Sequence, residues 1–163
     1  MRPAFLFLRM KKALKISLFV LLAIAIVIQF IGNGLPKNSN DLSKDLVRSE
    51  NAPEEVKAIL SKACYDCHSN QTTYPWYSYV APVSWLVIKD VREGREELNF
   101  SEWADQSKRR KVKILNEMAE EVEDKKMPLP VYTVTHRDAK LTDDEIATIT
   151  IWTKSVSSRI LGD

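Results

Sequence analysis

The chain has 163 residues and a formal net charge of +2, and 28% of its residues are charged. So balanced a charge gives no support for nucleic-acid binding, which requires a basic patch or stripe. The sequence has four glycines and shows no P-loop or glycine-rich nucleotide loop. It also shows no Ser/His/Asp arrangement for nucleophilic catalysis, so we do not expect an enzyme.

The first 36 residues differ in kind from the rest. Residues 1–15 form a basic n-region without acidic residues, and residues 16–36 carry no charge; the basic residues are Arg2, Arg9, Lys11, Lys12 and Lys15. An apolar run of about 20 residues is long enough to cross a bilayer core. A basic segment before such a run also occurs in cleaved secretory signals. Because no A-x-A-like cleavage site ends this run, the sequence favours an uncleaved transmembrane signal anchor over residues 16–36.

The charge pattern also predicts an orientation. Basic residues ahead of the apolar run predict that residues 1–15 stay in the cytoplasm. We therefore expect a single-pass protein of the inner, cytoplasmic membrane whose C-terminal part faces the periplasm. Residues 37–50 begin with a polar run and are assigned to a linker. The remaining residues, 51–163, are enough for one small domain.

Hydrophobic periodicity predicts that this domain is all-α. Helical patterns occupy residues 53–63, 83–98, about 101–123 and the segment that begins at Thr142. Ser101 is the expected cap of the third helix, in which Met118 falls on the apolar face. Thr142 and Glu145 have the spacing of a capping box for the last helix. The fold class expected is thus a small helical domain preceded by one transmembrane helix.

The most informative motif is Cys64-Tyr65-Asp66-Cys67-His68, which contains both cysteines of the chain. C-x-x-C-H is the attachment sequence of c-type haem. Two thiols three positions apart can each bond one vinyl group on the same porphyrin edge. The adjacent histidine then becomes the proximal ligand of the iron. The motif predicts one haem c per chain, held by Cys64 and Cys67 and ligated by His68.

Three other interpretations of the cysteines have to be weighed. A thioredoxin-like redox pair follows a strand in a βαβ pattern, and no such pattern is visible. A structural zinc site needs four N or S ligands, and the chain offers only Cys64, Cys67, His68 and His136. That set would have to use the adjacent Cys67 and His68 together, which suits a tetrahedron poorly. A disulfide between the two cysteines is allowed in an exported protein.

The sequence offers two residues for the distal iron position. Met127 lies in Met127-Pro128-Leu129-Pro130, where the prolines end the preceding helix and stiffen the backbone. Met127 is the expected distal ligand, in the His/Met pattern of many cytochromes c. His136, in a loop or short strand over residues 131–138, is the alternative ligand. An open distal position is the third possibility.

An aromatic loop follows the motif. Residues 69–82 contain two prolines and a polar run that break any long helix, and the loop is dense in Tyr and Trp. These rings are expected either to cover a haem face and exclude water or to pack in the domain core.

The motifs together resemble a known family. They are Cys64-Tyr65-Asp66-Cys67-His68-Ser69-Asn70, Tyr74-Pro75-Trp76-Tyr77, Pro82-Val83-Ser84-Trp85, Asn99-Phe100-Ser101-Glu102-Trp103, Met127-Pro128, Tyr132, His136 and Ala139-Lys140-Leu141. Over about residues 45–156 the chain resembles the monohaem haem-binding domain family of exported bacterial proteins. The segment from Leu141 to Trp152 is also similar to the C-terminal helix of class I cytochromes c. Many family members carry Met-Pro-Pro where this chain has Met127-Pro128-Leu129-Pro130.

The resemblance implies a small α-helical c-type cytochrome, with thioether bonds at Cys64 and Cys67 and His68 on the iron. The function expected is the transfer of single electrons between redox partner proteins that the sequence does not identify. The membrane is contacted through the N-terminal helix, and nucleic acid is not expected as a partner. The alternatives are a haem-based gas or redox sensor with an open distal site, and a haem-free interaction domain held by a Cys64–Cys67 disulfide.

Overall fold

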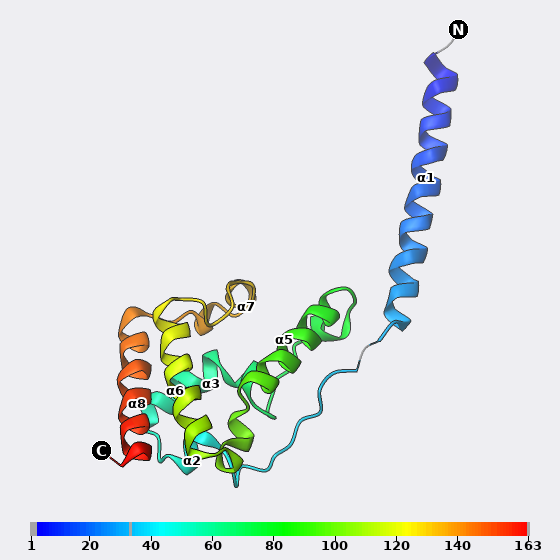
Figure 1. Cartoon of the computed structure of the whole chain (residues 1–163). Helices are drawn as coiled ribbons and strands as arrows, with labels where there is room; N and C mark the ends of the chain where they lie inside the picture. The colour runs from blue at the N-terminus through cyan, green and yellow to red at the C-terminus, as the bar shows by residue number, and fades with distance from the viewer. Residues whose placement is uncertain (1–2, 33, 163) are drawn as a thin grey trace. The chain divides into compact units, whose positions relative to one another are not determined.

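The part of the chain that the structure describes consists of helices and loops without strands (Figure 1). This computed structural model describes residues 3–32 and 34–162, with side chains from Arg9 onward. The helices are α1 (Pro3–Val27), α2 (Leu46–Ser49), α3 (Glu54–Ala63), α4 (Tyr65–His68), α5 (Val83–Glu97), α6 (Lys108–Glu123), α7 (Pro130–Thr135) and α8 (Asp143–Leu161). Four 3-10 turns are η1 (Ile28–Phe30), η2 (Trp76–Tyr79), η3 (Phe100–Asp105) and η4 (Arg137–Ala139). The all-α expectation is confirmed; Arg2, Asn33 and Asp163, which the sequence assigned to the n-region, the anchor and the domain, lie outside the described residues.

The described residues group into two compact units. One contains the N-terminal segment up to Leu35 together with Pro75–Lys89, and the other contains Pro36–Tyr74 together with the chain from Asp90 onward. Helix α5 therefore supplies residues to both units.

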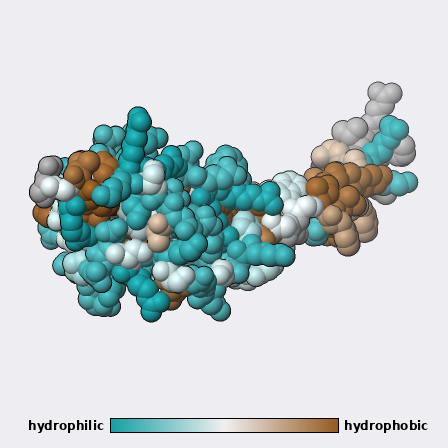
Figure 2. Space-filling view, turned by 60° about the horizontal axis from the view of Figure 1, so that its bottom comes forward, coloured by the Kyte–Doolittle hydropathy of each residue, from teal (hydrophilic) through white to brown (hydrophobic). Residues whose placement is uncertain are grey.

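The first unit contains one helix long and apolar enough to cross a membrane, by its length and composition. The apolar span runs from Arg9 to Phe30, which is 22 residues. Its apolar side chains are exposed; Phe19, for example, is 71% exposed. The largest hydrophobic area in Figure 2 lies over α1, whereas the helical domain presents a mostly hydrophilic surface in that view.

The core of the second unit is formed mainly by α3, α6 and α8, whose apolar faces follow the periodicity of an amphipathic helix. Leu60 from α3, Leu115 from α6 and Ile149 from α8 are at most 1% exposed, and Trp103 from η3 is fully buried. Met118 is buried in the same cluster, which confirms that it is a core methionine.

The segment assigned to a linker is partly built into this core. Asp45 caps α2 by accepting a hydrogen bond from the backbone N–H of Val47, at 2.9 Å. The next residue, Leu46, is fully buried in the core cluster. Residues 45–49 therefore belong to the packed domain. The burial of the Leu46 side chain in the core holds the single turn of α2 against it.

Two local predictions are wrong. Ser101 does not cap the third helix, because η3 intervenes and Ser107 caps α6 by accepting a hydrogen bond from the Arg110 N–H. The short strand considered for residues 131–138 is instead α7, with Pro130 in its first turn, followed by η4. Proline is favoured in the first turn of a helix because its N–H is not needed there.

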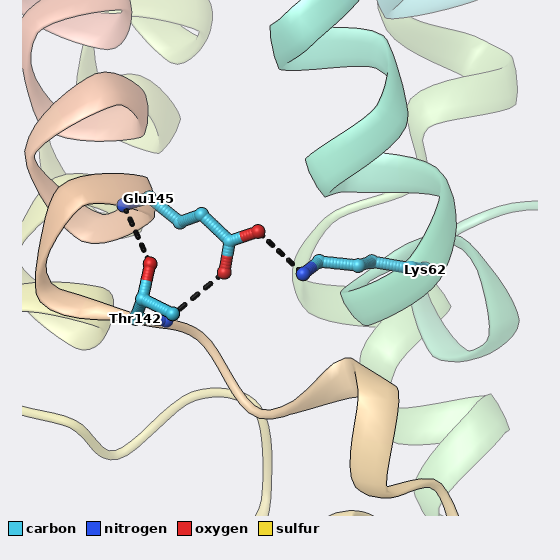
Figure 3. A network of polar contacts seen from close by, with 3 residues as sticks. All are labelled: Lys62, Thr142 and Glu145. Atoms are coloured by element: carbon cyan, nitrogen blue, oxygen red, sulfur yellow. Dashed lines mark hydrogen bonds and ion pairs between the residues drawn. The ribbon is translucent and has the colours of Figure 1, made fainter.

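The N-terminus of α8 is joined to α3 by a polar network (Figure 3). The Thr142 hydroxyl accepts a hydrogen bond from the Glu145 N–H, and the Glu145 carboxylate accepts one from the Thr142 N–H, at 2.9 Å. The predicted capping box is thus confirmed. The same carboxylate pairs with the Lys62 ammonium near the end of α3. Since α3 leads directly into Cys64, this network helps to hold the helix that carries the motif.

Thr142→Ala should lower the free energy of unfolding by about 1 kcal/mol, because it leaves a backbone N–H of the first turn without its cap. Thr142→Ser keeps the hydroxyl and serves as the matched control. Chemical denaturation of the detergent-solubilised chain, followed by circular dichroism, measures both variants. Equal stability of Thr142→Ala and Thr142→Ser would contradict the role of the cap.

The Lys62–Glu145 pair should make stability depend on pH in the acid range. The Lys62 ammonium and the Thr142 N–H hold the pKa of Glu145 below its ordinary value of 4.5. A lowered carboxyl pKa contributes stability above about pH 4.5, and that contribution is lost as the pH falls through the folded-state pKa. Lys62→Met should cost about 0.5–1 kcal/mol at pH 7 and progressively less below pH 4.

A matched control for this charge removal is Lys57→Met, on the same helix. Lys57 pairs only with Glu54 at a more exposed position, where the two side chains are 42% and 88% exposed. We expect that variant to change the unfolding free energy little at either pH. A difference between wild type and Lys62→Met that is the same at pH 3 and pH 7 would refute the linkage.

Candidate functional site

The C-x-x-C-H motif forms one helical turn at the end of α3. The Cys64 N–H donates to Leu60 at 2.9 Å, and the Cys64 carbonyl accepts from Cys67 and His68, at 3.2 and 2.9 Å. Residues three and four apart lie on the same face of a helical turn, with about 5–6 Å between Cβ atoms. Cys64 therefore lies on the same face of the turn as Cys67, at i,i+3, and as His68, at i,i+4.

The His68 imidazole is fixed by two backbone carbonyls of the α5 region. Its Nδ1 lies 2.9 Å from the Gly94 oxygen and 3.1 Å from the Leu98 oxygen. Since carbonyl oxygens only accept hydrogen bonds, Nδ1 must carry the ring proton. Burial lowers the pKa of His68, against the opposing effect of the two carbonyls, so the neutral ring is favoured at pH 7. The Nε2 lone pair is left without a partner among the described residues, which is the state of a haem-ligating histidine.

Gly94 allows the close packing of α5 against the motif. A Cβ atom built on Gly94 would lie 2.7 Å from the Cys67 carbonyl oxygen and 3.2 Å from the Cys67 Cβ. Any larger residue would push the motif backbone away from α5. An isolated glycine usually weakens a helix, but α5 continues through Gly94 to Glu97.

The two intervening residues of the motif anchor the turn. The Tyr65 hydroxyl donates to both carboxylate oxygens of the buried Asp45, at 2.9 and 3.0 Å. The Asp66 carboxylate accepts from the Thr73 N–H at 2.8 Å and from the Tyr132 hydroxyl at 2.7 Å. Burial, together with these carboxylates, raises the pKa of both tyrosines, so their hydroxyls stay protonated and act as donors.

Arg95 bonds the residues that follow the motif. Its Nε donates to the Ser69 carbonyl at 2.8 Å, and its Nη2 donates to the Thr72 hydroxyl at 2.9 Å. A third contact runs from Nη1 to the Lys37 carbonyl, at 2.8 Å. One guanidinium thus ties the exit of the C-x-x-C-H turn to the segment that precedes the domain, using the fixed fork of donors that distinguishes arginine.

The two thiols are free and lie in a protein environment that keeps them protonated. Burial and the neighbouring Cys67 raise the pKa of Cys64 to about 12. Burial, with the nearby carboxylates of Asp90 and Asp66, raises the pKa of Cys67 to about 11. Reactive redox cysteines instead have lowered pKa values near positive groups or helix N-termini. The environment does not favour thiolate-based redox chemistry at this pair.

The described side chains do not form an alternative metal centre. Within residues 9–32 and 34–162, no three His, Cys, Asp or Glu side chains group closely enough to hold a metal ion. The four-ligand zinc site therefore does not assemble there. The strand that precedes a thioredoxin-like C-x-x-C is also absent from the described part of the chain.

The two candidate distal ligands lie in different surroundings. Met127 is partly buried against the core, and its N–H donates to the Glu121 carbonyl at 3.0 Å. His136 follows α7, and its ring stacks on Tyr132 at a centroid distance of 4.1 Å. Through the Tyr132 hydroxyl bond to Asp66, the structure connects the segment of His136 to the motif. The choice between Met127 and His136 as distal ligand stays a prediction.

The aromatic loop after the motif does not supply the core. Trp76 and Tyr79, in η2, are 77% and 59% exposed, and neither belongs to the core cluster. The expectation that these two rings pack in the domain core is wrong.

The sequence did not identify four residues that build this site: Asp45, Asp66 and Arg95, and Tyr132 as the partner of Asp66. Their roles depend on contacts between segments 20 to 66 residues apart, which a local pattern does not reveal. Gly94 did leave a signal, since an isolated glycine inside a helical pattern often has a packing reason.

Gly94→Ala should destabilise the protein by about 1–3 kcal/mol, because the new methyl group collides with the Cys67 backbone. At an ordinary helix position the same change would stabilise by about 1 kcal/mol. Glu96→Ala, at an exposed position of the same helix, is the matched control and should have little effect. Unfolding of both variants by denaturant gives the sign of the change in unfolding free energy. A Gly94→Ala variant more stable than wild type would contradict the close contact.

The residues present fit a haem group: two free thiols and a neutral imidazole with an available Nε2 on one helical turn. A family model described as "Haem-binding domain" matches residues 23–155, which is most of the chain. No curated protein and no solved structure matches it. The chain belongs to the haem-binding domain family and is a haem-binding protein.

Proposed function

We propose that this protein is a membrane-anchored monohaem c-type cytochrome that transfers single electrons between partner proteins. The observation that carries the proposal is the C-x-x-C-H turn, with the His68 Nδ1 proton held by the Gly94 and Leu98 carbonyls. Family membership gives haem binding; the motif turn supports the covalent, c-type form with one haem per chain.

In this proposal the sulfur atoms of Cys64 and Cys67 hold the cofactor as thioethers, and the Nε2 atom of His68 ligates the iron. When bound, haem c supplies a one-electron ferrous/ferric couple. The protein residues keep the imidazole neutral, fix its orientation and limit access of water. Hydrogen bonds to the second nitrogen of a ligating histidine raise its basicity as a ligand. No catalytic role on a substrate is proposed.

For the distal position we propose Met127, with His136 as the alternative. Met127 is supported by its place four residues after the end of α6, where its N–H donates to the Glu121 carbonyl and Pro128 follows it. His136 is supported by the link from Tyr132 to Asp66 within the motif. A thioether ligand gives a higher reduction potential than a second imidazole.

The anchor in this proposal is α1. Its apolar span, Arg9–Phe30, follows basic residues that include Lys11 and Lys12. By the positive-inside rule, this order supports an orientation in which the helical domain lies on the periplasmic side of the inner membrane. That side is also where covalent haem attachment and electron exchange with exported partners take place.

The visible spectrum of the full chain, produced with a cytochrome c maturation system, tests the proposal. We expect a sharp c-type α band on reduction that carbon monoxide does not shift, because both axial positions are occupied by protein ligands. A carbon monoxide shift in the wild type would instead indicate a gas or redox sensor with an open distal site. Absence of haem absorbance would overturn the proposal in favour of a haem-free domain.

Met127→Ala should lower the reduction potential and allow carbon monoxide to bind the ferrous form, because it removes the proposed thioether ligand. Met118→Leu is the matched control, because it replaces a core methionine by a residue of similar volume. It should leave the visible spectrum and the reduction potential unchanged. His136→Ala tests the alternative in the same experiment. An unchanged Met127→Ala spectrum together with a changed His136→Ala spectrum would assign the ligand to His136.

A further inference from the structure

The segment from Trp76 to Leu86 has a surface pattern opposite to that of a water-facing helix. Its exposed side chains are apolar or aromatic: Trp76 at 77%, Tyr79 at 59%, Val80 at 42%, Val83 at 45%, Trp85 at 38% and Leu86 at 42%. Its two serines, Ser78 and Ser84, are fully buried. Single exposed apolar residues are normal, but six within eleven consecutive residues, with both serines turned inward, indicate an interaction surface. We call these six exposed residues the aromatic face.

The aromatic face is joined by hydrogen bonds to the end of the apolar span. The Gln29 side-chain amide donates to the Ala81 carbonyl at 3.1 Å and accepts from the Ala81 N–H at 2.9 Å. The Trp85 indole N–H donates to the Ile31 carbonyl at 3.0 Å. All these residues lie in one compact unit, and the family match, residues 23–155, covers both sides of the contact.

These bonds have the form expected where water is scarce. A glutamine inside an apolar span is costly in lipid unless its amide is paired. The Gln29 amide is paired three times, since it also donates to the Ala25 carbonyl at 2.8 Å. Trp and Tyr are enriched at the membrane interface, where their rings lie among headgroups and their polar atoms find partners.

We infer that the aromatic face lies in the headgroup region of the membrane beside the end of α1, as a second, interfacial membrane contact. The inference rests on the membrane anchor proposed above and adds its lipid-contacting surface. A lipid surface is favoured over a protein partner because the face is continuous, through Gln29 and Trp85, with a helix whose exposed apolar side chains require lipid. An interfacial segment of this kind fixes the end of a membrane helix more firmly than the helix alone.

The test uses the full haem-loaded chain in vesicles of phosphatidylcholine and phosphatidylglycerol. A fraction of the lipid carries a diazirine near the glycerol end of its acyl chain, and the carbene label is mapped by mass spectrometry. We expect label in residues 76–86 and at the end of α1, and none in the α6 peptide 115–123. Retention of the chain after an alkaline carbonate wash reports the anchor independently.

A triple variant, Trp76→Ser, Tyr79→Ser and Leu86→Ser, should lose the label in residues 76–86 and stay in the carbonate-washed membrane. The matched control is Val134→Ser with Ile151→Ser, which removes apolar residues that are 73% and 69% exposed elsewhere. Unchanged haem absorbance shows that each variant is folded.

The outcomes separate the two proposals. A chain that is washed from the vesicles overturns the anchor and, with it, this inference. A retained chain whose residues 76–86 carry no more label than residues 115–123 overturns the inference alone. A dimer of the detergent-solubilised chain, measured by size-exclusion chromatography with light scattering and abolished in the triple variant, would assign the aromatic face to a second copy of this chain and also overturn the inference.

Discussion

The contact between α5 and the C-x-x-C-H turn determines how the site is held. At Gly94 the backbones approach so closely that a Cβ atom would meet the Cys67 carbonyl at 2.7 Å. That approach lets the Gly94 and Leu98 carbonyls reach the His68 Nδ1 atom, which in turn fixes the tautomer of the ring. The absence of a side chain at Gly94 in α5 therefore decides the tautomer and orientation of the His68 ring in α4.

A four-residue turn such as α4 cannot be stable by itself, because helix nucleation costs more than one turn returns. The contacts of its intervening residues with distant segments compensate: Tyr65 with Asp45, and Asp66 with Tyr132. Each is a hydrogen bond to a carboxylate, a type worth about 1.5–3 kcal/mol. The positions written as x in the motif thus help to hold the motif in place, and in the proposed cytochrome they leave the cysteines and the histidine for the cofactor.

Local patterns in the sequence were sufficient for most of the fold. The period of Leu115, Met118 and Val122 and the Thr142–Glu145 capping box each predict an element that the structure contains. The third helix begins six residues later than expected, because both Ser101 and Ser107 are good caps and only packing at η3 selects between them. The site was predictable as a motif, whereas its support was not, since the local sequence around Asp45, Arg95 and Tyr132 does not show which distant segments they bond.

For the aromatic loop, hydropathy alone does not distinguish between the environments in which its side chains could lie. Trp and Tyr have an apolar body and a polar edge, so the same residues suit a protein core, a haem contact and a membrane interface. The burial of Ser78 and Ser84 in a segment that exposes Trp76 and Leu86 favours the membrane interface, because a segment surrounded by water would expose its serines. The Gln29 amide, on the other side of the contact, also favours the interface. Its hydrogen bonds with the Ala81 backbone stabilise most where water cannot replace them. Polar groups therefore carry more information than apolar ones about the medium that this part of the chain faces.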